Sequence, residues 1–114
     1  MSDIVRRAIH ARPELTAELL RRGIFEPEEK AEFLQSAPVR TELPGLPLGP
    51  VQFATLLAEG DTQLAARVVL RSLLRPNELT WLNRLVRFQK PSVKRDELAR
   101  IIERTLEGRK GNAR

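Results

Sequence analysis

Residues 50–76 read PVQFATLLAEGDTQLAARVVLRSLLRP, and this stretch decides the fold class. Pro50 and Pro76 stand where helices are expected to begin, and Gly60 separates two apolar runs, because proline favours the first helical position and glycine the position just past the last one. The second run, 62–74, is apolar around most of its circumference. A helix of that kind belongs at the centre of a bundle. Its apolar residues are Leu64, Ala65, Val68, Val69, Leu70, Leu73 and Leu74.

Proline and glycine mark helix ends in the rest of the chain as well: Pro13 and Pro27 each precede a helix-like run, and Gly23 and Gly108 each follow one. Asp61 is a good N-cap for the 62–74 helix, because its carboxylate can accept the exposed amides of the first turn. No segment alternates apolar and polar residues as a half-buried strand would. The expected helices are 3–11, 13–22, 27–35, 50–59, 62–74, 77–89 and 92–108. The predicted fold is therefore all-α, a compact single-domain bundle of six to seven short helices.

Residues 37–50, APVRTELPGLPLGP, contain prolines and glycines that exclude regular structure. The segment still carries Leu43, Leu46 and Leu48, whereas a free linker is normally rich in glycine, serine or charge. The 36 residues before it are too few to hold a core alone. We therefore expect an ordered, polyproline-like strap across one bundle. The alternative is a docking peptide for an aromatic-lined groove.

This reading divides the single domain, 1–114, into four parts. They are a helical N-terminal part at 1–36, the strap at 37–50, the main helical bundle at 51–108 and a basic frayed tail at 109–114.

Composition limits the kind of protein and its environment. The chain has 114 residues, 41% of them apolar, which suffices for one domain with its own core. No window approaches the ~18 uncharged apolar residues that a membrane span needs, and the N-terminal segment lacks the apolar core of a signal peptide. Cysteine is absent, which excludes disulfides and cysteine metal sites. We expect a soluble cytoplasmic protein, and the excess of arginine over lysine suits a GC-rich bacterial or phage genome.

Positive charge is concentrated in one third of the chain. The formal net charge is +5 overall, but residues 62–95 hold eight basic side chains and a single acidic one, Glu78. The basic residues are Arg67, Arg71, Arg75, Arg84, Arg87, Lys90, Lys94 and Arg95. The first three recur every four residues, and the next three share one face of the 77–89 helix. If these two helices were antiparallel neighbours, their stripes would form one basic surface that attracts polyanions.

The leading hypothesis is a non-enzymatic accessory or regulatory protein whose basic helical face, 62–95, contacts the backbone of a nucleic acid. All eight basic residues would supply phosphate contacts, which give affinity and little specificity. A solvated polar face without a partner explains the same pattern equally well. Two helix-turn-helix candidates, one around Thr62, Gln63 and Arg67 and one around Lys94, are too weak to predict sequence-specific readout.

The alternative is a protein-interaction module, an adaptor or anti-activator, either monomeric or a homodimer, that docks on an acidic or apolar partner surface. Its interface would combine the strap leucines Leu43, Leu46 and Leu48 with Trp81 and Phe88, because tryptophan anchors are common at interfaces. For Trp81 itself, residue statistics favour burial in the core.

Residues suited to catalysis are scarce. His10 is the only histidine, and the serines have no base nearby in sequence. No pair of histidine, cysteine or aspartate has the spacing of metal ligands, and the glycines form no phosphate-binding motif. We expect no enzymatic activity, no metal and no cofactor.

Overall fold

The computed structural model describes residues 2–36, 47–71 and 73–112, and these residues form seven α-helices without any strand. The helices are α1 (Asp3–Ile9), α2 (Pro13–Arg22), α3 (Pro27–Ser36), α4 (Pro50–Glu59), α5 (Thr62–Leu70), α6 (Pro76–Arg87) and α7 (Val93–Asn112). The prediction of an all-α fold is confirmed.

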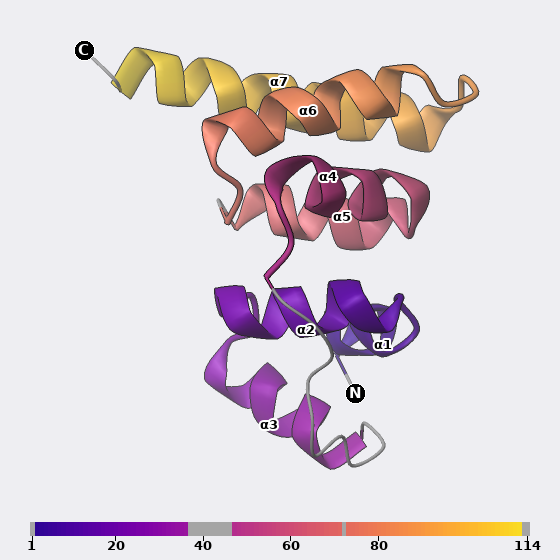
Figure 1. The fold of residues 1–114 in the computed structure, drawn as a ribbon, viewed down its shortest axis with the longest axis vertical. Helices are drawn as coiled ribbons and strands as arrows, with labels where there is room; N and C mark the ends of the chain where they lie inside the picture. Colours follow the sequence, from indigo (N-terminus) through magenta and orange to yellow (C-terminus); the bar gives the residue numbers. More distant parts are fainter. Residues whose placement is uncertain (1, 37–46, 72, 113–114) are drawn as a thin grey trace.

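The helices stack in layers along the longest axis of the molecule (Figure 1). α3 lies at one end, α1 and α2 form the next layer, α4 and α5 the third, and α6 and α7 the layer at the other end. α4 packs mainly on α6, α5 packs mainly on α7, and α6 and α7 pack on each other. One apolar core takes residues from all seven helices, and the radius of gyration is 14.2 Å. The chain is therefore one compact bundle.

α5 is buried on one broad side only. Its core residues are Leu64, Ala65, Val68 and Val69. Leu70, in contrast, is 62% exposed, so the expectation that it belongs to the core is wrong. α5 contacts α1, α4 and α7, and these three neighbours leave uncovered the face that carries Gln63, Arg67 and Leu70 at helical spacing.

Several helix ends follow the predicted local chemistry. Asp61 accepts the amides of Gln63 and Leu64 at 2.8 Å and 3.3 Å, which confirms it as the N-cap of α5. Gly23 ends α2 in the left-handed conformation, with φ of 71°, and the amide after it bonds back to Leu19 at 3.2 Å. This is the αL ending that glycine adopts without a steric penalty.

Two helix ends differ from the prediction by four residues, whereas the other ends agree with it to within two residues. α5 ends at Leu70 instead of residue 74, with Arg71 as its C-cap; Arg75 is extended ahead of Pro76, and Leu74 is buried in the core. α7 continues through Gly108 to residue 112, so the expected frayed tail is helical over 109–112, while 113–114 lie outside the described residues. Arg109 donates to the carbonyl of Leu74 and holds this last stretch of α7 on the bundle.

Only the end of the expected strap, residues 47–50, lies within the described part of the chain; Leu43 and Leu46 fall outside it. Leu48 is half-buried and packs against the core. Its amide donates to Glu18 Oε1 at 3.0 Å. At this residue the segment packs as a strap would, just before α4 begins.

A buried ion network ties α2 to the C-terminal helices. Arg22 donates two hydrogen bonds to Glu78 of α6, from Nη1 to Oε1 at 3.0 Å and from Nη2 to Oε2 at 2.6 Å. Its Nε donates to Glu18 Oε2 at 2.9 Å, and its guanidinium carbon lies 3.9 Å from the ring centroid of Phe53 in α4. Glu18 and Glu78 are only 4% and 1% exposed. Three helices, α2, α4 and α6, therefore meet at one guanidinium.

Backbone amides complete the coordination of the two carboxylates. Glu78 Oε1 accepts the amide of Arg75 at 3.1 Å, and Glu18 Oε1 accepts the amide of Leu48. Burial alone would raise the pKa of Glu18, but the hydrogen bonds from Leu48 and Arg22 outweigh burial and hold that pKa below its ordinary value. Glu18 is therefore ionised at neutral pH and remains paired with Arg22.

Replacing Arg22 by alanine is expected to lower the free energy of unfolding by about 3–5 kcal/mol, because it leaves buried carboxylates without their cation. Urea denaturation followed by circular dichroism at neutral pH measures this loss. The control is Arg104→Ala, which removes an exposed side chain of α7 and should change the unfolding free energy by less than about 0.5 kcal/mol. Equal effects of the two substitutions would show that the network does not hold the fold.

Candidate binding surfaces

α5 and α6 do not form a packed pair. α6 packs on α4 and α7, whereas α5 packs on α1, α4 and α7, and Figure 1 shows α5 and α6 in different layers. The apolar side of each helix is buried against those neighbours instead of against the other helix. The expected merging of their two arginine stripes into one basic surface is therefore wrong.

Arg71, the middle residue of the α5 stripe, is neutralised inside the protein. Its two terminal nitrogens donate to the two carboxylate oxygens of Glu29 at 2.8 Å and 3.0 Å, and Nη1 also donates to the carbonyl of Ile24. The Arg71 side chain is 24% exposed and that of Glu29 16%. The hydrogen bonds from Arg71 hold the pKa of Glu29 below its ordinary value. The expectation that Arg71 is free to contact phosphate is wrong, because this residue joins α3 to the end of α5.

Two further basic residues are engaged between α6 and α7. Arg87 forms an ion pair with Glu103 of α7. Arg95 pairs with Asp96 at 2.9 Å and donates to the carbonyls of Arg87 and Gln89 at 3.4 Å and 3.0 Å. These contacts close the turn between the two helices. We expected Arg87 and Arg95 to belong to a basic surface without carboxylates, and this expectation is wrong because both form ion pairs.

The other five basic residues are exposed and make no ion pair within the described part of the chain. They are Arg67, Arg75, Arg84, Lys90 and Lys94. They do not share one surface: Arg67 and Lys94 lie on a groove between α5 and α7, whereas Arg84 belongs to α6.

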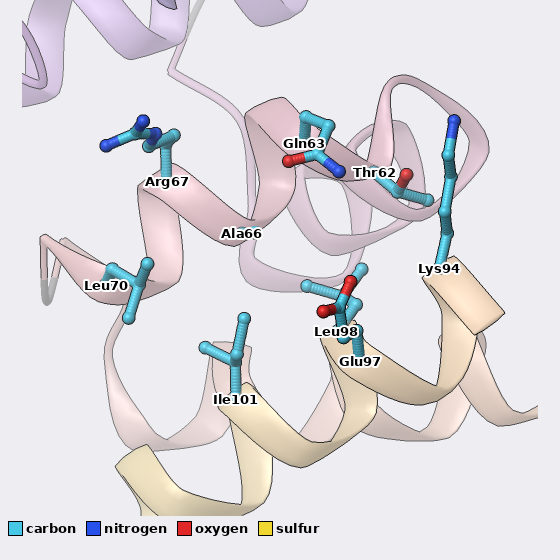
Figure 2. A pocket seen from close by; sticks show the side chains of 9 residues that line it. All are labelled: Thr62, Gln63, Ala66, Arg67, Leu70, Lys94, Glu97, Leu98 and Ile101. Carbon is cyan, nitrogen blue, oxygen red and sulfur yellow. The ribbon is translucent and has the colours of Figure 1, made fainter.

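The groove between α5 and α7 has a cavity of about 350 Å³ (Figure 2). α5 supplies Thr62, Gln63, Ala66, Arg67 and Leu70, and α7 supplies Lys94, Glu97, Leu98 and Ile101. Figure 2 shows Lys94 at one end of the groove and Arg67 near the other. Residues from both weak helix-turn-helix candidates therefore line the same groove. The two candidates are far apart in the sequence, so this proximity was not predicted.

The outer face of α6, defined by Trp81, Arg84 and Phe88, carries exposed aromatic residues. These three residues follow helical spacing, i, i+3 and i+7, on the side away from the core. Phe88 is 89% exposed and Trp81 40%, so the expected burial of Trp81 is wrong. The Arg84 guanidinium lies 5.5 Å from the Trp81 ring centroid, within range of a cation–π interaction. The opposite side of α6 buries Glu78, Leu79, Leu82 and Val86.

The remaining residues of the alternative interface have different positions. Leu48 packs against the core and presents only part of its surface, and the other strap leucines lie outside the described residues. The exposure of Leu70 was missed, because this residue stands in an apolar run that was expected to belong to the core. The spacing of Trp81, Arg84 and Phe88 was visible in the sequence, but only the packing of α6 shows which side faces outward.

Metal and membrane chemistry receive no support from the described residues. Within 2–36, 47–71 and 73–112, no three His, Cys, Asp or Glu side chains are grouped so as to hold a metal ion. None of the described helices combines the length and apolar character needed to cross a membrane. Comparison of the chain with protein-family models, curated proteins and solved structures finds no match in any of the three.

Replacing Glu29 by glutamine is expected to lower the thermal unfolding midpoint at neutral pH, because Arg71 loses its carboxylate partner. Since the pKa of Glu29 is lower in the folded protein, the pair contributes fully above the ordinary value of 4.5. That contribution is lost as the pH falls through the lower folded pKa. The difference in midpoint between wild type and variant should therefore shrink as the pH is lowered below 4.5.

Melting curves recorded by circular dichroism at neutral pH and in steps below the ordinary pKa measure this difference. Glu28→Gln, an exposed neighbour on the same helix, is the control and should leave the midpoint nearly unchanged. A deficit of the Glu29 variant that persists in full at low pH would contradict the ion-pair explanation.

Proposed function

We propose that this protein is a non-enzymatic protein-interaction module that binds an acidic partner protein through the outer face of α6. The supporting observation is the exposure of two large aromatic rings around one guanidinium that has no ion pair among the described residues. Single exposed apolar residues are ordinary on protein surfaces. Trp81 and Phe88, however, lie about two helical turns apart on the same face, with Arg84 between them. Tryptophan and arginine are the residue types that most often carry the binding energy of an interface.

Charge complementarity defines the partner's chemistry. The only acidic residue of α6, Glu78, is buried on the opposite side of the helix, so no carboxylate of α6 neutralises Arg84. Arg87 is held by Glu103 in a pair whose side chains are 61% and 40% exposed, and a surface pair of this kind contributes little. A partner segment with apolar and acidic side chains would bury the two rings and place its carboxylates on the arginines.

Nucleic acid is the second candidate for this face, since exposed aromatic rings beside arginine also suit single-stranded nucleic acid. The geometry favours it less. Arg71 is engaged within the fold, and the cations without an ion pair among the described residues are dispersed, since Arg67 and Lys94 line the α5–α7 groove and Arg84 belongs to α6. In the part of the chain that the structure describes, the basic side chains therefore do not form one long surface through the outer face of α6 that an extended phosphate backbone would follow.

Replacing Phe88 or Trp81 by alanine is expected to weaken partner binding by about 2 kcal/mol, roughly thirtyfold in Kd, and the Phe88 substitution, at a side chain that is 89% exposed, should leave the unfolding midpoint nearly unchanged. The immobilised wild-type protein and both variants are incubated with cell extract, and the captured proteins are quantified by mass spectrometry. The matched control is Leu34→Ala, which removes an apolar side chain of α3 that is 63% exposed.

A protein retained by the wild type and by the Leu34 variant, but lost from the Phe88 and Trp81 variants, identifies the partner, whose Kd is then measured directly. Arg84→Glu should also abolish its capture, because the substitution sets a carboxylate against an acidic surface. Retention of the same proteins by all variants would reject the interface. If nuclease treatment removed the captured material, the outer face of α6 would be assigned to nucleic-acid binding instead of protein binding.

A further inference from the structure

The α5–α7 groove gathers four hydrogen-bond donors that binding through α6 does not use. Thr62, Gln63 and Arg67 come from α5, and Lys94 comes from the first turn of α7. Figure 2 shows them around the groove, with Thr62 beside Lys94 and Arg67 farther along. None of these side chains has a hydrogen-bond or ion-pair partner among the described residues. Their donors are therefore available to a ligand.

The interior of the same groove is lined by apolar side chains. Ala66, Leu98 and Ile101 line it, and Leu70 stands exposed at its margin (Figure 2). Eight residue steps of α5, from Thr62 to Leu70, correspond to a length of about 12 Å at 1.5 Å per residue. A cavity of about 350 Å³ lies at the small end of the range for ligand pockets, so it accepts a small group or a short segment of a chain.

The chemistry of the donors points to phosphate groups. Arginine, lysine, threonine and glutamine are among the side chains that contact the phosphates and sugars of nucleic acids. A single strand, unlike a duplex, also exposes its bases and sugars to the aliphatic side chains of the groove. One carboxylate, Glu97, lies among the lining residues and leaves the groove with a net charge of +1.

We propose that the α5–α7 groove binds the backbone of a single-stranded nucleic acid, with Arg67 and Lys94 contacting phosphates. Thr62 and Gln63 add neutral hydrogen bonds, and Leu70 and Ile101 contact a base or sugar. The proposal is independent of the outer face of α6, since the two surfaces share no residue. With two ionic contacts, binding is weak, insensitive to sequence and dependent on salt.

Fluorescence anisotropy of labelled oligothymidylate and oligouridylate, titrated with the full chain at several salt concentrations, tests this site. Each phosphate contact on a single strand contributes about 0.7 to the slope of log K against log salt. The double variant Arg67→Gln, Lys94→Gln should therefore reduce the slope by about 1.4, which is about sevenfold in affinity over a fourfold change in salt. Glu97→Gln should strengthen binding, because it removes the carboxylate from the groove.

The matched control is Arg100→Gln with Arg104→Gln, which removes the same charge from α7 outside the groove and should leave the slope unchanged. Circular dichroism and melting curves establish that each variant is folded. Trp81→Ala and Phe88→Ala should bind the oligonucleotides as the wild type does, which separates this site from the outer face of α6.

Three results would overturn the proposal. The first is no binding of either oligonucleotide at low salt, and the second is an equal loss of slope in the two double variants. The third is tighter binding of a duplex, or of polyglutamate of matched length, than of the single strands; polyglutamate would reassign the groove to acidic proteins.

Discussion

The guanidinium of Arg22 is the contact on which the arrangement of the helices depends. It lies on the ring of Phe53 and bonds to both oxygens of Glu78, while its Nε bonds to Glu18. Lysine has neither the planar face nor the forked donors for this, so arginine is required at the position. Buried ion pairs of this type add little net stability, but any arrangement that separates them leaves charges buried without partners. The network therefore favours one relative placement of α2, α4 and α6 over competing ones.

The placement of α6 determines which of its residues the protein presents to solvent. Glu78 bonds to Arg22, so the side of α6 that carries Glu78, Leu79 and Leu82 faces the core. Trp81 and Phe88 lie on the other side of the helix and therefore face solvent. The basic residues are separated for a similar reason, because α5 packs on α7 and Arg67 therefore lines the groove between these two helices, apart from Arg84 on α6. The two candidate surfaces thus follow from how the core is assembled.

Local chemistry predicted the helices, whereas long-range pairing could not be predicted. Proline starts, the Asp61 cap and the Gly23 ending involve neighbours in sequence, and all of them are present in the structure. In the sequence, no carboxylate lies four residues from Arg71 on its own helix, so this arginine was expected to be unpaired. In the structure, Arg71 bonds to Glu29, which is 42 residues away in the chain. Arg22 and Glu78 are 56 residues apart and gave no signal in the sequence. Exposure of Trp81 likewise depended on which neighbours α6 acquired.

α3 is the least secured helix of the bundle. Phe33 is its only buried residue, stacked on Phe25 at a centroid distance of 5.1 Å, and Glu29 adds its bond to Arg71. Elements with so few buried contacts open locally far more often than the whole domain unfolds, and their amides exchange with solvent fastest. Each such opening would expose the Phe25 ring and release Arg71 beside Arg67, one turn away on α5. The positive charge of that helix is thus coupled to the transient detachment of α3.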